Sequence, residues 1–275
     1  MCCSRSGGRI ALDASPFSTP SSPRPDLIPS SVPLPLQNPV ILDSVPFILG
    51  VKTAGQCLSF DKTKPTLVHL IPRPGGPAAR AGKPRVTCSL PACFVFHHAN
   101  AYEDPSTGRV VVDSAVLPEL VDFEMVSGGV GGDFRDVDFD AVPVNTLWRH
   151  TLDPATGKAE GVELSRRVIE FPRINPRVQG QKHRYVYMAA ARHPTRNQPL
   201  QGYLKYDAET GATDLWDMGP RVFGGEPEFV PKPVATGASG DSDEGWLVGL
   251  VFDASISRSK FVILDAKNLG ELSLG

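Results

Sequence analysis

A short turn pattern that recurs along most of the sequence constrains the fold more than any other feature. Complete Asp-x-x-Thr-Gly copies stand at residues 104–108, 153–157 and 207–211, and related turns begin at Asp61 and Asp253. The aspartate side chain bonds backbone amides and the glycine supplies a positive φ, so each complete copy predicts the turn of a β-hairpin. The five aspartates follow one another at intervals of 43 to 54 residues, a period typical of one four-stranded propeller blade. We therefore predict a β-propeller, with an evenly spaced β-sandwich as the alternative.

Short alternating segments between the turns predict a chain built almost entirely of strands. The 27 prolines and 26 glycines leave few long helical patterns, as expected for many short strands joined by turns. About four to five blades fit after residue 46. The predicted strands are 66–71, 85–89, 93–99, 109–116, 146–152, 161–171, 183–190, 202–206, 213–217, 228–230, 245–252 and 260–264.

Residues 1–39 differ in composition from the rest of the chain. Ser, Pro and Arg dominate, and the only acidic residues are Asp13 and Asp26. A segment of this kind cannot assemble an apolar face, so we expect it to be disordered. The composition is typical of a plastid transit peptide; the alternative is non-coding sequence translated ahead of a truncated gene.

Charge and cysteine usage exclude several classes of function. The 28 basic and 30 acidic residues nearly balance, so nothing indicates a nucleic-acid-binding surface. No apolar run approaches the ~18 residues that span a bilayer, so we expect no transmembrane segment. The five cysteines form no Cys-x-x-Cys pair, which argues against a zinc site or a disulfide framework and favours a reducing compartment. Plastid and cytoplasm both remain open.

Two adjacent histidines interrupt one of the apolar strands. In residues 94–99 the period-2 pattern places Phe94, Phe96 and His98 on one face and His97 on the other. A buried imidazole needs a partner for each ring nitrogen. A metal on one nitrogen and a hydrogen bond to the other would satisfy both. Taken alone, however, the pattern favours an ordinary core histidine over a metal ligand.

Three motifs together resemble the carotenoid cleavage dioxygenases, the family that includes the retinal pigment epithelial membrane protein. They are Phe-His-x-x-Asn-Ala-Tyr-Glu at 96–103, Glu-Phe-Pro-x-Ile-Asn at 170–175 and Gly-Glu-Pro-x-Phe-Val-Pro at 225–231. The resemblance implies a seven-bladed propeller with Fe²⁺ on its axis, held by four histidines from four blades. It implies that His97 is one of these metal ligands, and that Glu170 and Glu226 orient iron-bound imidazoles through their outer nitrogens.

The resemblance further implies cleavage of a carotenoid or apocarotenoid double bond by O2, with peripheral membrane contact. It implies a partial propeller domain over 40–275 that lacks N-terminal blades and the C-terminal closing strand. No residue is predicted to act directly as a catalytic acid, base or nucleophile. One ligand of four is present, because the histidines at 69, 150, 183 and 193 match no ligand motif and are expected to be structural or on the surface.

Three interpretations follow from these patterns. The first is an iron-dependent carotenoid oxygenase lineage in which this chain is a truncated, inactive form. The second is a non-catalytic propeller remnant that acts as a binding module, whose exposed end blades favour association. The third sets the resemblance aside and takes the repeats as a generic interaction propeller.

Overall fold

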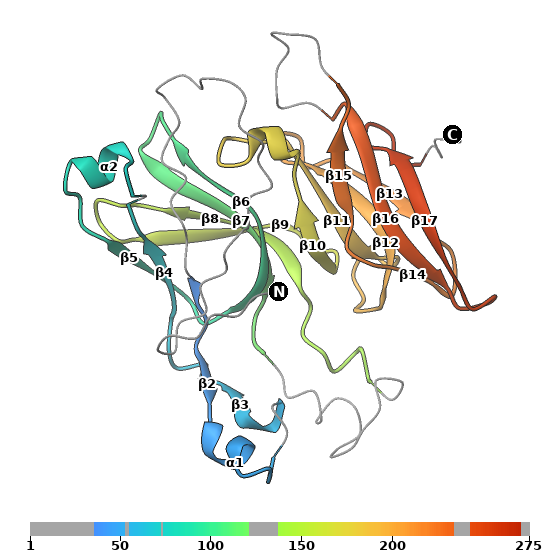
Figure 1. Ribbon diagram of the computed structural model, residues 1–275, viewed down its shortest axis with the longest axis horizontal. Helices are drawn as coiled ribbons and strands as arrows, with labels where there is room; N and C mark the ends of the chain where they lie inside the picture. Colours follow the sequence, from blue (N-terminus) through green and yellow to red (C-terminus); the bar gives the residue numbers. More distant parts are fainter. Residues whose placement is uncertain (1–35, 53–54, 73, 121–136, 234–242, 271–275) are drawn as a thin grey trace.

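The computed structural model describes residues 36–52, 55–72, 74–120, 137–233 and 243–270, and most of the predicted tail 1–39 lies outside these ranges (Figure 1). Strands dominate the described chain, as predicted. The strands are β1 Leu36–Gln37, β2 Val40–Leu42, β3 Leu58–Phe60, β4 Thr66–Leu70, β5 Val86–Leu90, β6 Phe94–Asp104, β7 Arg109–Leu117, β8 Thr146–Leu152, β9 Ala159–Ser165, β10 Ile169–Arg173, β11 Tyr185–Ala191, β12 Leu200–Asp207, β13 Thr213–Asp217, β14 Val222–Gly224, β15 Glu228–Pro231, β16 Gly245–Asp253 and β17 Arg258–Asp265. The helical segments are α1 Ser44–Ile48, α2 Pro77–Arg80, η1 Gly55–Cys57 and η3 Pro176–Val178.

Three four-stranded antiparallel sheets follow one another in chain order across the molecule (Figure 1). Two are simple meanders, β6-β7-β8-β9 and β10-β11-β12-β13. In the third, β17 pairs along the whole of β16, while β14 and β15 pair with opposite halves of the other edge of β16. A smaller sheet, β1-β4-β5, and the β2–β3 pair precede them. Successive four-stranded meanders are the architecture of propeller blades.

The predicted hairpin turns are confirmed at all three complete copies. Asp104, Asp153 and Asp207 each accept a backbone N–H two residues further on, at 2.9, 2.8 and 2.9 Å. The glycines that end these turns have φ values of 66 to 74°, a region that side chains rarely tolerate. The period was misread, however: the first two turns close the β6–β7 and β8–β9 hairpins of one sheet. Because the β7–β8 connection is long, the two turns of this one sheet lie as far apart in sequence as turns of successive blades would.

Two predicted strands differ from the structure by more than two residues. The single strand expected at 161–171 is two strands, β9 and β10, in different sheets. Residues 166–168 carry the chain from one sheet to the next, and so short a crossing leaves no turn signal. The strand expected to end at residue 99 continues to Asp104. The short strands β1, β2, β3 and β14 were not predicted.

The core lies between neighbouring sheets rather than inside any one of them. One cluster joins β7 and β8 to the second sheet through buried Leu147 and Ile169. Another joins the second and third sheets through Tyr203 and Phe229. A third lies between β4–β5 and the first four-stranded sheet. Face-to-face burial of this kind is what holds propeller blades together.

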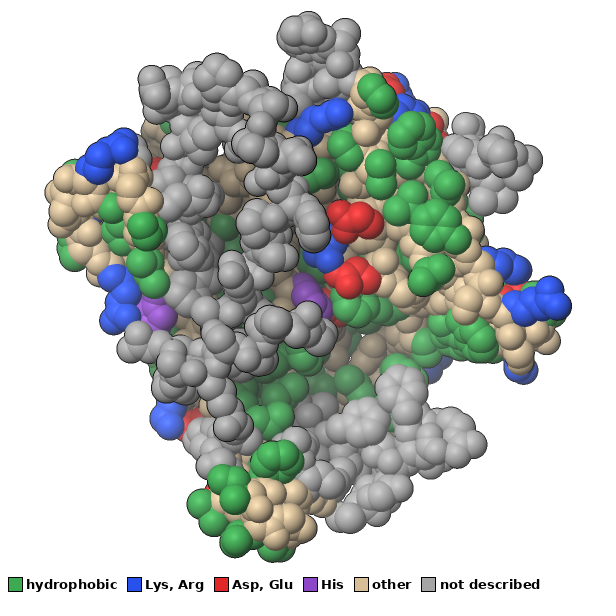
Figure 2. Space-filling model, in the orientation of Figure 1, with side chains coloured by type: hydrophobic (Ala, Val, Ile, Leu, Met, Phe, Trp, Pro, Cys, Tyr) green, Lys and Arg blue, Asp and Glu red, His purple; other side chains and the backbone are tan. Residues whose placement is uncertain are grey.

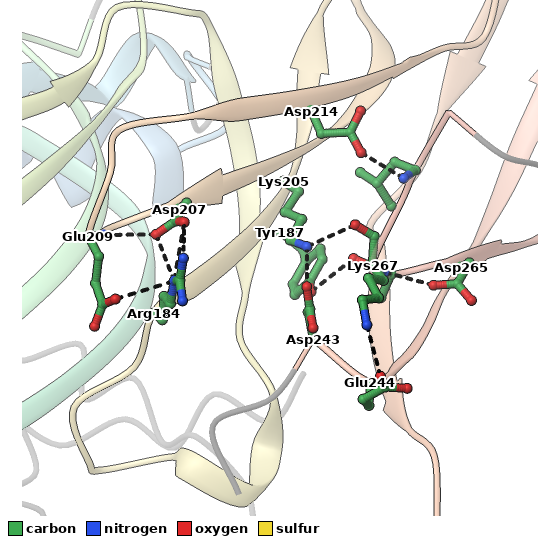
Figure 3. Close-up of polar contacts among 12 residues, drawn as sticks. Arg184, Tyr187, Lys205, Asp207, Glu209, Asp214, Asp243, Glu244, Asp265 and Lys267 are labelled. Carbon is green, nitrogen blue, oxygen red and sulfur yellow. Dashed lines mark hydrogen bonds and ion pairs between the residues drawn. The ribbon is translucent and has the colours of Figure 1, made fainter. Parts of the chain in front are cut away.

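Polar contacts also tie the second sheet to the third (Figure 3). Lys205 on β12 donates from Nζ to Asp243 Oδ2 at 2.6 Å and to the carbonyl of Lys267 at 3.0 Å. The hydroxyl of Tyr187 donates to the carbonyl of Ala266 at 3.2 Å. The buried ammonium therefore has partners on both sides of the segment that contains β16 and β17.

The outer face of the third sheet is apolar and open. Leu250 and Phe252 on β16 and Phe261 and Ile263 on β17 are exposed, and Leu250 pairs directly with Phe261. Figure 2 shows hydrophobic side chains gathered over β15, β16 and β17. A patch of this kind on a sheet face is typical of a surface that packs against another.

Candidate metal-ligand site

Strand β6 sends its two histidines to different partners because its register is irregular. Val95 pairs with Val116, but the next pairings, His98 with Ser114 and Asn100 with Asp113, show two shifts characteristic of β-bulges. The predicted strict alternation of faces is therefore wrong in this segment. His98 Nδ1 lies 2.7 Å from Ser114 Oγ within the same sheet.

His97 instead meets a carboxylate from the next sheet. Its Nδ1 lies 2.7 Å from Oε2 of Glu170 on β10. The two side chains are 39% and 16% exposed, so the ring stays reachable while the carboxylate is largely covered. A carboxylate can only accept in this pair, so Nδ1 carries the proton. In the neutral ring, Nε2 then keeps its lone pair for another partner.

Three donors hold the Glu170 carboxylate. Besides His97, the Oε2 atom accepts the backbone N–H of Phe171 at 2.5 Å. Oε1 accepts from Nδ2 of Asn145 at 2.8 Å. Phe171 has a φ of 54°, an uncommon conformation for a bulky residue and one found mostly where other contacts enforce it. Its ring lies 5.2 Å from the imidazole of His97.

The charges around His97 favour its protonated form. The hydrogen bond to Glu170 raises the pKa of His97 above its ordinary value, against an opposing effect of burial. The charge of Glu226 adds to the increase, while that of Arg173 opposes it. Figure 2 shows acidic and basic side chains beside a histidine near the middle of one face.

Glu226 pairs with an arginine in this structure. Its carboxylate forms an ion pair with Arg173 on β10, and Arg173 Nε also lies 3.2 Å from Glu228 Oε2. The side chain of Glu226 is 45% exposed. Among the described residues, no hydrogen bond joins it to a histidine. The structure thus brings Glu170, but not Glu226, into hydrogen-bond contact with His97.

Two residues of this cluster were not predicted from the sequence. Arg173 fills the variable position of the Glu-Phe-Pro-x-Ile-Asn motif, and Asn145 lies in a connection without a motif. No local pattern marks either residue, because both reach the cluster through the packing of one sheet on the next. Only the register of neighbouring sheets reveals them.

Comparison with known proteins decides the family. The profile described as Retinal pigment epithelial membrane protein matches residues 34–275. An apocarotenoid-15,15'-oxygenase from Synechocystis is 40% identical over 85% of this chain and 44% of its own length. A carotenoid 9,10(9',10')-cleavage dioxygenase 1 from Pisum sativum is 28% identical over 80% of this chain and 40% of its own length. The chain belongs to the carotenoid oxygenase family.

Solved structures of carotenoid oxygenases confirm the fold of this chain. The crystal structure of cobalt-substituted Synechocystis ACO superposes with a TM-score of 0.75 and 40% identity, over 86% of this chain and 46% of that one. The crystal structure of a chimera of ACO and the retinal pigment epithelial membrane protein RPE65 superposes with the same TM-score and 39% identity. The predicted all-β, partial propeller is therefore confirmed. The chain spans about half the length of the relatives it matches.

Other histidines of this family member have structural surroundings. His183 is buried, with Nε2 2.9 Å from Asp113 Oδ2 and Nδ1 2.9 Å from Asn100 Nδ2. His150 is buried and its ring stacks on Trp148. Two more histidines, at 69 and 193, bond Thr87 and a nearby loop. Each of the four rings therefore has a protein contact, and their structural or surface role stays a prediction.

The side chains at this site fit one ligand of an iron site. His97 offers an imidazole whose Nδ1 is held by a carboxylate, which is the usual arrangement of a metal-binding histidine. Across the described ranges, no three His, Cys, Asp or Glu side chains gather in a way that could hold a metal ion. The described residues therefore fit a single ligand and not a complete site.

Proposed function

We propose that this chain carries one iron ligand of an Fe²⁺-dependent oxygenase that cleaves a double bond of a carotenoid or apocarotenoid with O2. The observation that carries the proposal is the hydrogen bond between His97 and Glu170, made across two sheets. Both residues lie in motifs that resemble the family, at positions for which the resemblance implies a metal ligand and the glutamate that orients it. The matched relatives are named for the cleavage of carotenoids and apocarotenoids.

In this proposal His97 presents Nε2 to the metal, and Glu170 fixes the tautomer and ring angle. Ferrous iron, when bound, supplies the binding and activation of O2. Glu226 would orient a second imidazole, and in this structure its carboxylate pairs with Arg173. Because a lone imidazole binds a divalent metal weakly, this chain by itself holds iron below one equivalent and is inactive.

Paramagnetic NMR tests the ligand assignment directly. Co²⁺ titrated into the purified chain is expected to broaden the ring resonances of His97 before those of other histidines. The accompanying broadening of the Phe171 ring, 5.2 Å from the imidazole, should disappear in His97→Ala. His69→Ala is the matched control, since His69 lies half-buried on β4 and should leave the broadening unchanged. Early broadening at another histidine, or none at His97, would overturn the assignment. Metal analysis that finds one tightly held iron per chain would overturn the prediction of an incomplete site.

We also propose peripheral membrane contact through the segment around α1. Val45, Phe47, Ile48, Leu49 and Val51 are all exposed, and exposed apolar side chains on a short helix are typical of interfacial anchors. No described helix is long and apolar enough to cross a membrane. Flotation with neutral phosphatidylcholine vesicles should fall in the double variant Ile48→Ser, Leu49→Ser; equal flotation would contradict the contact.

A plastid location is proposed from the composition of residues 1–39. One matched relative, 28% identical, is named carotenoid cleavage dioxygenase 7, chloroplastic, from Arabidopsis thaliana. A fluorescent protein fused after residue 39 should enter plastids, and a fusion that begins at residue 40 should not. Cytoplasmic fluorescence from both fusions would exclude a plastid location and leave the cytoplasm.

A second candidate function is that of a non-catalytic binding module, and the open face of the third sheet favours it. The exposed residues on β16 and β17 suit contact with a second copy of this chain. Sedimentation velocity should show self-association that falls in the double variant Leu250→Ser, Phe261→Ser. A monomeric wild-type chain would remove the support for this candidate.

A further inference from the structure

We infer that Asn145 is a positioning residue that holds the Glu170 carboxylate against His97; its meaning for iron rests on the proposed function. Asn145 directly precedes β8 in the first four-stranded sheet and is buried. It reaches the second sheet twice. Its Nδ2 donates to Glu170 Oε1 at 2.8 Å, and its carbonyl accepts the N–H of Ile169 at 2.9 Å.

These two hydrogen bonds hold two successive residues of β10, Ile169 and Glu170. The backbone bond fixes the start of β10, and the side-chain bond fixes the carboxylate of the next residue. Glu170 Oε2 already accepts from Phe171 and His97. Asn145 is the only described donor to the other oxygen, so it sets the rotation of the carboxylate about its last bond.

The orientation of the Asn145 amide follows from the charge of Glu170. Turned the other way, Oδ1 would face a carboxylate oxygen, and two acceptors would repel each other. In the observed orientation, Oδ1 is buried and has no partner among the described residues. A buried acceptor left without a hydrogen bond destabilises the fold, so the contact with Glu170 must outweigh that cost.

Loss of this donor should change the state of the imidazole. Glu170 Oε1 would be left covered without a hydrogen bond, and the carboxylate could rotate to seek water. Its Oε2 would then no longer stay 2.7 Å from His97 Nδ1. The ring would populate the other tautomer, in which Nε2 carries the proton and cannot bind a metal.

The experiment measures the tautomer of neutral His97 by ¹⁵N-edited NMR in the metal-free chain, at one pH above its titration range. Wild type is expected to show the Nδ1–H form. Asn145→Leu, which keeps the shape but lacks the donor, should give a tautomer mixture, and Asn145→Gln should restore much of the Nδ1–H form. Glu170→Ala is the positive control. Asn197→Ala is the matched control, because Asn197 donates to the carbonyl of Val142 instead.

An unchanged Nδ1–H form in Asn145→Leu would overturn the inference. If that variant fails to fold, Asn145→Ser replaces it, since serine keeps a polar side chain at the buried position but is too short to reach Glu170. Co²⁺ titration of the same samples separates the two proposals. Loss of about 10-fold in Co²⁺ affinity at His97 is expected alongside the tautomer change. A tautomer change without any Co²⁺ effect at His97 would refute the iron role and leave the positioning role intact.

Discussion

Glu170 and His97 come from different sheets, yet their side chains meet with 2.7 Å between Oε2 and Nδ1. The hydrogen bond raises the pKa of His97. In Glu170→Gln the shape is kept but the charge is lost, and Asn145 can turn its amide so that Oδ1 accepts from the new NH2 group. We expect the pKa of His97 to fall back toward about 6.5 in this variant. NMR titration of the ring measures it.

The same variant should change how stability depends on pH. A folded-state pKa above the unfolded value means that the charged pair stabilises fully below about pH 6.5. That contribution is lost as the pH rises through the folded-state pKa of His97. Urea unfolding should therefore show a larger difference in the free energy of unfolding between wild type and Glu170→Gln at about pH 6 than at about pH 9. A difference independent of pH would contradict the link to His97.

A second prediction concerns Asp113, which is fully buried on β7. Burial would raise its pKa, but hydrogen bonds from Arg149 and His183 outweigh this and lower the pKa below its ordinary value. Asp113→Asn leaves the Arg149 guanidinium without its carboxylate and should cost about 3 kcal/mol at neutral pH. Asp140→Asn, in an exposed ion pair with Arg196, is the matched control and should change stability by about 0–1 kcal/mol.

The lowered pKa also sets the direction of the pH effect. The Asp113 carboxylate stabilises the fold above its unfolded pKa of about 3.9, and this stabilisation disappears as the pH falls through the lower folded value. Chemical denaturation at several pH values should therefore show that the free energies of unfolding of wild type and Asp113→Asn converge in acid. Free energies of unfolding that diverge in acid would show that the folded protein holds the Asp113 carboxyl group protonated.

Local sequence patterns predicted much of this fold because they encode local structure. The turns at Asp104, Asp153 and Asp207 could be read from five residues each, since the side-chain bonds and the glycine lie within the turn. Strands with clear alternation, such as β8, were placed to the residue. Blade assignment failed because the spacing of turns does not reveal which hairpins share a sheet.

The site was predictable in parts and not as an assembly. Motif letters pointed to His97 and Glu170, but the bulges that turn the histidine toward β10 depend on pairing with β7. The ion pair between Glu226 and Arg173 forms because β10 lies beside the segment that precedes β15. Asn145 enters through a contact between two sheets. Such contacts depend on three-dimensional register, which a single sequence does not carry.

A third prediction tests the bond between the second and third sheets at Lys205. Its side chain is 10% exposed, with Nζ 2.6 Å from Asp243 and 4.4 Å from the ring centre of Tyr185. Lys205→Met keeps the length of the side chain but leaves Asp243 unpaired, so we expect a loss of about 3 kcal/mol in the free energy of unfolding. Lys260→Met is the control, because Lys260 is 53% exposed in its pair with Asp253. Equal losses in both variants would show that the Lys205 contact has no special role.

A fourth prediction concerns Gly249, at the centre of β16. A Cβ at this position would overlap the hydroxyl of Tyr203 on β12, which donates to the carbonyl of Gly225 at 3.3 Å. The ring is fully buried between the sheets, so it cannot move aside. Gly249→Ala should therefore cost about 1–3 kcal/mol through overpacking.

The double variant Gly249→Ala, Tyr203→Phe identifies the cause of that loss. Removal of the hydroxyl takes away the atom that the new Cβ overlaps most closely, so the two changes together should cost less than the sum of the single costs. Gly270→Ala is the control, since nothing lies within 4 Å of a Cβ there; its effect should stay within about 0.5 kcal/mol. Thermal unfolding of wild type, Gly249→Ala, Tyr203→Phe, the double variant and Gly270→Ala measures these terms. Strict additivity would mean that Gly249 is needed for the backbone of β16 itself and not for the approach of Tyr203.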